Sequence, residues 1–252
     1  MGAKMDSEQI EAILDKLAPS AALKPTTLRR SKRVVLDDTV GDENTRRMFV
    51  NGIQEESQFA AMTPEKLATR FTQGLQLFDY ENMTDVSRLA HWKASSSKPG
   101  NPIENALDDD PETFWQSDGS QPHQIEVYFS KRMSIVQLML YFSLIADESY
   151  TPRFVCIYAG HSPSDALFYK TLEVRNVNGW VSLTFEDSRP HDKLLKCQYL
   201  RFVFPANHEN GKDTHLRGIR VFAPSKKLSM ASTELIQCFG HGSKLMSECS
   251  LR

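Results

Sequence analysis

The sequence contains few cysteines, no long apolar run and almost no net charge. Its four cysteines form no CxxC pair, so a thiolate metal site is not expected. No uncharged apolar stretch reaches the roughly 18 residues of a membrane-spanning helix, and no apolar signal-peptide segment begins the chain. The formal net charge of -2 argues against a general nucleic-acid-binding protein, which is usually strongly basic. We therefore expect an intracellular protein with neither a membrane nor a nucleic acid as partner.

Motifs that mark common catalytic and cofactor sites are also missing. The sequence has no GxSxG, no GxxxxGK[ST] and no GxGxxG. Residues 108–110 are three aspartates, but Pro111 follows them and the stretch is more typical of a turn. His208, Asp213 and His215 lie within eight residues, yet no second set of ligands with metal spacing accompanies them. We therefore expect no metal, no cofactor and no enzymatic activity.

The first quarter of the chain is an extension that differs from the rest. Residues 1–62 contain an amphipathic pattern at 6–18, which predicts a short helix that packs either on its own domain or on a partner. The basic cluster at 24–33 is either a solvated segment or a nuclear-import signal. Two apolar pairs, Val34-Val35 and Phe49-Val50, are expected to hold this extension against the domain that follows.

Residues 63–224 have the patterning of one all-β domain. Thr63 and Pro64 are typical of a helix start, and apolar residues at helical spacing predict a leading helix at 64–79. From about residue 83 the apolar period changes to two, and no helix is expected between the strands. The pattern predicts an antiparallel β-sandwich of the jelly-roll type, with a turn at Asn178-Gly179 and strands at 124–129, 135–142, 154–159, 168–174, 180–185, 199–204 and 219–222.

The end of the chain, residues 225–252, is rich in Ser, Lys and Gly. Leu235-Ile236 and Cys238-Phe239 are its only notable apolar spots. We expect a flexible tail, because such a composition cannot build a core of its own.

Three polar loops adjoin the predicted strands. Residues 207–215 have no apolar side chain, residues 147–152 follow a buried strand, and residues 116–123 form the third loop. The loops of a sandwich gather at its two ends, where recognition usually takes place. These side chains either satisfy one another, as in ordinary turns, or hydrogen-bond an extended ligand. Nine consecutive non-apolar residues exceed what a connection needs, so 207–215 is interpreted as a ligand-binding loop.

Several of these stretches together resemble one known family. Their residues and their order along the chain resemble those of the DOC-domain subunit of the anaphase-promoting complex, a cell-cycle ubiquitin ligase. The resemblance covers roughly residues 83–224 and the last residues, and the N-terminal extension looks like the budding-yeast type. The stretches that carry it are 90–100, 107–123, 147–152 and 207–217.

The resemblance implies a jelly roll related to discoidin and galactose-binding modules, in a subunit without catalytic activity. With a WD-repeat coactivator, such a subunit forms a shared receptor for the destruction box, an extended degron in cell-cycle substrates, and promotes processive ubiquitination. It also implies that the protein works in the nucleus and cytoplasm. The positions that match the family's degron-facing residues are Asp147, Glu148, Ser149, Tyr150, Asn207, His208, Asn210, Asp213, Thr214 and His215.

The resemblance further implies a docking tail, because a C-terminal Ile-Arg pair of the family binds a TPR-repeat scaffold subunit. The matching pair here is Leu251-Arg252, in which Leu replaces Ile. A free carboxylate, a guanidinium and an apolar side chain together make a compact anchor. The alternative function is a discoidin-like carbohydrate- or lipid-binding module, but that would favour exposed aromatic residues at loop tips that are polar here.

Overall fold

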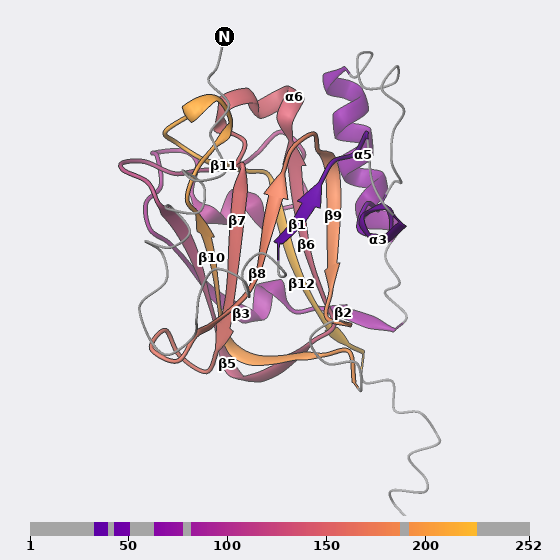
Figure 1. Ribbon diagram of the computed structural model, residues 1–252, viewed down its shortest axis with the longest axis vertical. Coiled ribbons are helices and arrows are strands. Elements are labelled where there is room, and N and C mark those ends of the chain that lie inside the picture. The colour runs from indigo at the N-terminus through magenta and orange to yellow at the C-terminus, as the bar shows by residue number, and fades with distance from the viewer. Residues whose placement is uncertain (1–32, 40–42, 51–62, 78–81, 187–191, 226–252) are drawn as a thin grey trace, which may run out of the picture.

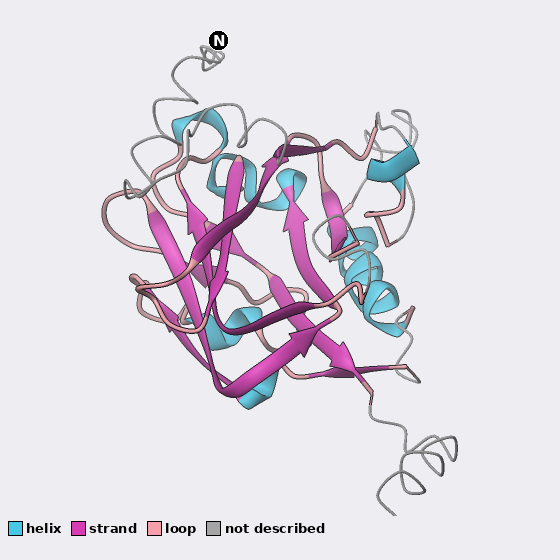
Figure 2. Ribbon diagram, turned by 60° about the horizontal axis from the view of Figure 1, so that its bottom comes forward, coloured by secondary structure: helices cyan, strands magenta, loops and turns pink. Residues whose placement is uncertain are grey.

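The computed structural model describes residues 33–39, 43–50, 63–77, 82–186 and 192–225. They form two sheets packed face to face (Figures 1 and 2). The six-stranded sheet has the order β1 (Arg33–Leu36), β8 (Leu167–Val174), β7 (Phe154–Gly160), β10 (Leu195–Phe204), β5 (His123–Ile135) and β3 (Ala90–Ala94). The four-stranded sheet has the order β2 (Met83–Asp85), β12 (Gly218–Pro224), β6 (Gln137–Ser143) and β9 (Asn178–Thr184).

Every strand pair in the two sheets is antiparallel except β1 with β8, so the predicted antiparallel sandwich is confirmed. A small ladder joins β4 (Trp115–Gln116) to β11 (His215–Leu216). The helices are α3 (Glu43–Arg46), α5 (Pro64–Gln76) and α6 (Leu144–Asp147), with 3-10 turns η1 (Ser87–Leu89), η2 (Ile103–Ala106), η3 (Glu148–Tyr150) and η4 (His208–Asn210). In the described ranges, every helix is too short or too polar to cross a bilayer.

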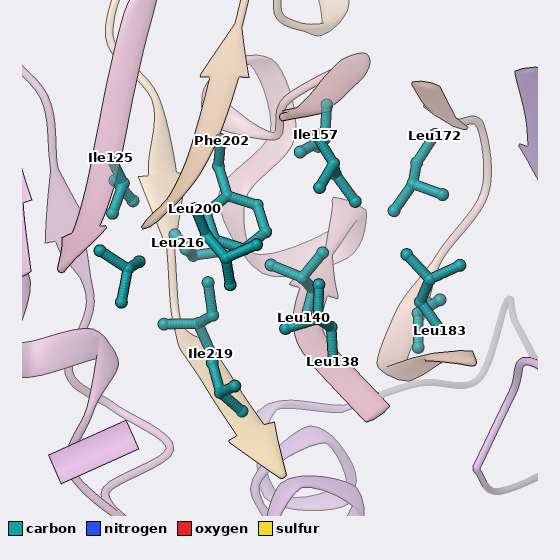
Figure 3. Packing of buried hydrophobic residues seen from close by; sticks show 14 of the residues in the cluster. Ile125, Leu138, Leu140, Ile157, Leu172, Leu183, Leu200, Phe202, Leu216 and Ile219 are labelled. Atoms are coloured by element: carbon teal, nitrogen blue, oxygen red, sulfur yellow. The ribbon is translucent and has the colours of Figure 1, made fainter. Parts of the chain in front are cut away.

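The main core fills the space between the sheets. Figure 3 shows side chains of both sheets gathered there, among them Ile157, Leu140 and Leu183. Strand β6 is buried on both faces, as the sequence predicts. Its Leu140 faces this core, whereas Met139 and Tyr141 belong to a second apolar cluster on the other side of the sheet.

Helix α5 covers that second cluster and lies beside β9 (Figure 1). Thr63 caps it by accepting a hydrogen bond from the Lys66 N–H, and Pro64 takes the first helical position. The described helix ends at Gln76, and residues 78–79 of the predicted span lie outside the described ranges. The helix start predicted from Thr63 and Pro64 is therefore confirmed.

Trp180 of β9 lies between this helix and the sheet. Its indole N–H donates to the Phe71 carbonyl oxygen at 2.9 Å, and its ring centroid is 5.0 Å from that of Phe71. A Cβ atom at Gly74 of α5 or at Gly218 of β12 would overlap the indole ring. Glycine at both positions is therefore what allows the helix and β12 to approach the ring so closely.

The extension contacts the domain through both predicted apolar pairs. Val34, in β1, packs against the main core, and Phe49 forms an isolated bridge with Val181. Arg33, the last residue of the basic cluster, is an ion-pair partner of the buried Glu173 and belongs to the fold. The predicted helix at 6–18, the rest of the basic cluster and the tail from 226 onward, with Leu251 and Arg252, lie outside the described residues.

Two local predictions are wrong. Asn178-Gly179 does not form a turn but begins β9, because the buried Asn178 side chain accepts from the Ile145 N–H at 2.9 Å and so holds two chain segments together. The short helix α6 lies between β6 and β7, where no helix is expected. Ser143 caps it, since its hydroxyl accepts from the Ala146 N–H.

Candidate functional site

The three polar loops meet at one end of the sandwich. Figure 1 shows α6 and β11 at this same end. A bridge pairs Pro152 with Asn207, and the Ser117 N–H donates to the Thr214 carbonyl oxygen at 3.0 Å. We call residues 114–123, 144–152 and 207–217 the end-loop cluster.

Asp147 is the buried anion of the end-loop cluster. Arg217 donates to both of its carboxylate oxygens, from Nε at 2.8 Å and from Nη2 at 2.7 Å. His215 Nδ1 lies 3.0 Å from the Asp147 Oδ1 atom. Burial opposes the charged form of Asp147, but the hydrogen bonds from His215 and Arg217 outweigh it and lower the pKa of this carboxyl. Asp147 is therefore an ionised carboxylate that joins two loops.

His215 is the middle ring of an aromatic stack. Its centroid lies 4.2 Å from that of Phe114 on one side and 4.2 Å from that of Tyr150 on the other. The Arg217 guanidinium lies over the Phe114 ring at 5.1 Å. Tyr150 is 40% exposed, so it forms the outer face of the stack. Aromatic stacking of this kind fixes the orientation of the imidazole.

Phe114 and Arg217 are absent from the ten site residues that the sequence predicts. A signal for Arg217 was available, because it follows His215 by two residues next to a strand and so points to the same side. Phe114 precedes β4 and gives no comparable signal in the sequence. Its role depends on the pairing of β4 with β11, which lies a hundred residues away.

Asn207 and Thr214 hold the long loop from inside. Asn207 is 3% exposed, and its amide donates to the Asp213 carbonyl oxygen at 2.6 Å. Thr214 is fully buried, and its hydroxyl donates to the Asn207 side-chain oxygen at 2.9 Å. Ser117 accepts from the Thr214 N–H at 2.7 Å, which ties the loop to 114–123. These two predicted site residues therefore shape the loop.

Asp213 connects the same loop to a further segment. The Lys98 ammonium donates to its carboxylate at 2.6 Å, and this bond lowers the pKa of Asp213. Nearby, the Gln121 amide donates to the Gly211 carbonyl oxygen at 2.8 Å. A Cβ atom at Gly211 would overlap the Ser149 carbonyl oxygen, so only glycine allows these loops to pack together.

The remaining predicted residues lie at the surface or point elsewhere. Glu148, Tyr150 and Asn210 are exposed, whereas Ser149 is half-buried. Glu148 and Asn210 have positive φ angles of 45° and 59°. His208 Nε2 lies 2.8 Å from the Val174 carbonyl oxygen, and burial lowers the pKa of its imidazole. The structure therefore separates a buried framework from an exposed set.

The three residues considered as metal ligands have other partners. His208 contacts Val174, Asp213 binds Lys98, and His215 binds Asp147. Across the described ranges, no group of three or more His, Cys, Asp or Glu side chains has the arrangement of a metal site. The polar groups of the end-loop cluster are arranged for hydrogen bonding.

The chain is similar to members of one protein family along most of its length. Residues 55–248 match the family model described as "Anaphase-promoting complex, subunit 10 (APC10)". "Anaphase-promoting complex subunit DOC1" of Saccharomyces cerevisiae is 52% identical over 250 residues, which is 98% of this chain and 100% of that protein. "Anaphase-promoting complex subunit 10" of Schizosaccharomyces pombe is 41% identical over 144 residues, 57% of this chain and 76% of that protein.

Similarity extends to a human protein and to a bacterial solved structure. The human "Anaphase-promoting complex subunit 10" is 34% identical over 146 residues, 58% of this chain and 78% of that protein. A family 32 carbohydrate-binding module of Clostridium perfringens NanJ, solved with galactose, has a TM-score of 0.47 at 13% identity, over 56% of this chain and 98% of the module.

Proposed function

This chain belongs to the anaphase-promoting complex subunit 10 family, and from that membership we propose that it is a non-catalytic subunit of the anaphase-promoting complex. Its partners are then the other subunits of that complex. The sugar- or lipid-binding alternative is not favoured, because relatives from yeast to human are named as subunits of this complex.

We further propose that the end-loop cluster binds the destruction box of substrates, together with a WD-repeat coactivator. One observation supports this most directly: contacts between the loops immobilise the cluster, yet Glu148, Tyr150 and Asn210 remain exposed on it. An extended peptide offers repeated N–H and C=O groups, and a fixed set of polar side chains binds them at a small entropic cost.

The same arrangement explains why a second receptor is needed. A few polar contacts give weak binding, because ordering the peptide offsets most of the energy gained. A coactivator that holds the other half of the same peptide raises the effective concentration of the first half at the end-loop cluster. Prolonged residence of the substrate then favours processive ubiquitination.

The test removes exposed side chains without changing the backbone. Glu148 and Asn210 have positive φ angles, which glycine adopts freely, so Glu148→Gly with Asn210→Gly deletes side chains only. Each lost hydrogen bond costs about 1 kcal/mol, so we expect the Kd of a destruction-box peptide to rise about 30-fold. The measurement is peptide binding to the reconstituted complex with coactivator.

Lys193→Gly is the matched control. Like Glu148 and Asn210, Lys193 is exposed and has a positive φ angle, 52°. It precedes β10 and therefore lies at the end of that strand opposite the end-loop cluster. We expect this variant to bind the peptide as the wild type does. Equal binding by the double variant and the control would exclude the end-loop cluster as the peptide site.

We also propose that Leu251 and Arg252 dock in a TPR-repeat scaffold subunit. Removing both residues is expected to release the subunit from the complex, whereas Leu251→Ile, which introduces the family's residue, is expected to retain it. Co-purification with the scaffold measures both, and undiminished recovery of the truncated chain would refute this anchor. A nuclear and cytoplasmic location remains a prediction, as does an import role for residues 24–33.

A further inference from the structure

Three prolines of the chain follow a hydroxyl side chain, and the three hydroxyls lie in different surroundings. The pairs are Thr63-Pro64, Thr151-Pro152 and Ser162-Pro163. A proline-directed kinase accepts a hydroxyl directly before proline, because its groove offers no acceptor to an N–H of the next residue and proline has none. The sequence therefore contains three candidate phosphorylation sites, among which the structure discriminates.

Two of the three hydroxyls are poorly suited to phosphorylation. Thr151 is 1% exposed, and its hydroxyl donates to the Ser143 carbonyl oxygen at 3.3 Å. Ser162 is half-buried, and its hydroxyl donates to the Asp165 carboxylate at 3.0 Å. A phosphate on Ser162 would therefore lie beside a carboxylate of the same charge. Burial excludes the first pair, and repulsion disfavours the second.

The remaining hydroxyl, that of Thr63, is at the start of α5. Thr63, Pro64, Glu65 and Lys66 are all exposed, and Leu67 is the first buried residue of the helix. Lys66 is the third residue after the hydroxyl, so the segment combines a proline and a cation at the spacing that many proline-directed kinases select. A Ser or Thr followed by proline and then, two residues on, by Lys or Arg occurs once in the sequence.

We propose that Thr63 is a phosphorylation site for a proline-directed kinase that selects a basic residue three positions later, and that the phosphate then caps α5. In the reaction, Thr63 Oγ1 attacks the γ-phosphorus of ATP, the bond from that phosphorus to the β,γ-bridging oxygen breaks, and ADP leaves. The hydroxyl proton passes to a carboxylate of the kinase. The inference uses no residue of the end-loop cluster and does not depend on the proposed peptide site.

The first turn of α5 can open for the kinase without disturbing the core. Thr63 already has an extended backbone, with φ −101° and ψ 161°. The bonds across the turn include those from the Lys66 N–H to the Thr63 hydroxyl at 3.4 Å and from the Leu67 N–H to the Thr63 carbonyl oxygen at 3.0 Å. The first of them is long for a hydrogen bond, and helix ends fray. Opening the turn therefore exposes the four-residue segment while Leu67 stays in place.

A phosphate on Thr63 lies where a helix favours an anion. The first N–H groups of a helix have no carbonyl partner within it, and they give this end a partial positive charge. The phosphate replaces a neutral hydroxyl with a charge of about −2 and three acceptor oxygens. The hydroxyl now donates to the Glu65 carboxylate at 3.1 Å, and this exposed side chain can turn to solvent when that donor is lost. The phosphate therefore strengthens the start of the helix that packs on Trp180.

Mass spectrometry of the full chain, after treatment with such a kinase and ATP, tests the site. We expect phosphate on Thr63 and on the serine of Thr63→Ser, and none at this position in Thr63→Ala. Phosphate found on Ser162 instead would overturn the inference. So would an unmodified chain, if the same kinase phosphorylates a short Thr-Pro-x-Lys peptide.

The rate of phosphorylation tests the role of the cation. Lys66→Gln retains the capping hydroxyl and is expected to lower the kcat/KM of the kinase about tenfold, because one charged contact with the enzyme is lost. Lys131→Gln is the matched control, since Lys131 is exposed but lies in β5, outside the segment. Equal rates for the two variants would show that Lys66 is not selected and would overturn this part of the proposal.

Hydrogen exchange of the phosphorylated and unphosphorylated chains tests the capping role. We expect the Lys66 and Leu67 amides to exchange about threefold more slowly after phosphorylation, the ordinary effect of a charge at a helix N-terminus. The amides of Ile125 and Val127 in β5 are the reference and are expected to remain unchanged. Unchanged or faster exchange at the start of α5 would overturn the capping role.

Discussion

Two loops of this molecule are about equally polar but are built in different ways. In the hairpin between β7 and β8, Asp165 accepts hydrogen bonds from the N–H groups of its own neighbours, Ser162 at 2.6 Å and His161 at 3.0 Å. In the end-loop cluster, Asp147 binds His215, which lies 68 residues further along the chain. The hairpin closes on itself, whereas the end-loop cluster joins distant segments. Polarity alone therefore does not distinguish a loop that closes on itself from one that joins distant segments, but the sequence distance between bonded partners does.

The largest expected difference between the two loops is the cost of losing the carboxylate. In Asp147→Ala the Arg217 guanidinium stays largely buried without its anion, so we expect the free energy of unfolding to fall by about 3 kcal/mol or more. Asp165 is exposed and its bonds are local, so Asp165→Ala is expected to change stability far less. Chemical denaturation of the two variants measures their free energies of unfolding. Equal losses of stability would show that the two carboxylates contribute equally to the fold.

A smaller effect is expected at Asn207. Asn207→Ala removes two buried hydrogen bonds, to Asp213 and from Thr214, and leaves a buried hydroxyl without its acceptor. We expect a loss of about 1–3 kcal/mol in the free energy of unfolding. Ser164→Ala in the hairpin is the control and is expected to be near neutral, because that hydroxyl is exposed.

A loss of peptide binding in Asn207→Ala would not by itself show that Asn207 contacts the peptide. Because Asn207 supports the loop from inside, Asn207→Ala is expected to weaken peptide binding even if the peptide never touches it. Full stability of the variant, measured by thermal unfolding, would contradict this framework role and restore Asn207 as a direct contact.

The smallest expected effect is the contrast in pH dependence. The pKa of Asp147 is lowered, so its carboxylate stabilises the fold fully above the unfolded-state pKa of about 3.9, and this contribution is lost as pH falls toward the folded value. The pKa of Asp165 is lowered too, chiefly by the Ser162 N–H bond. We expect stability to fall below about pH 5, and to fall less steeply in either Asp147→Ala or Asp165→Ala than in the wild type. Identical slopes would show that the two carboxylates are equivalent.

The strands could be predicted from the sequence because their signals are local. Ile125, Val127 and Phe129 alternate with polar residues, and β5 contains them as expected. The start of α5 could be predicted equally well, because Thr63 is the N-cap and Pro64 lies in the first turn. A strand whose partners are uncertain is still recognisable from its own apolar period.

The inside and outside of the end-loop cluster could not be predicted in this way. Thr214 and Asp213 are neighbours, yet one is fully buried against Ser117 and the other binds Lys98 at the half-exposed edge. Those partners lie about a hundred residues earlier in the chain, and no period in the sequence links them. The turn predicted at Asn178-Gly179 is wrong for the same reason, because the partner of Asn178, Ile145, lies in α6.

The glycines on either side of Trp180 have a consequence for how the leading helix detaches. If α5 slid by one turn, a bulky residue such as Arg70 would replace Gly74 against the indole, where even a methyl group does not fit. The helix therefore has no stable intermediate position along the sheet: α5 is either fully docked or detached. Departure also removes the carbonyl partner of the indole N–H and admits water to the ring. The fluorescence emission of Trp180 is therefore expected to shift to longer wavelength, over the emission of the two other buried tryptophans, Trp92 and Trp115.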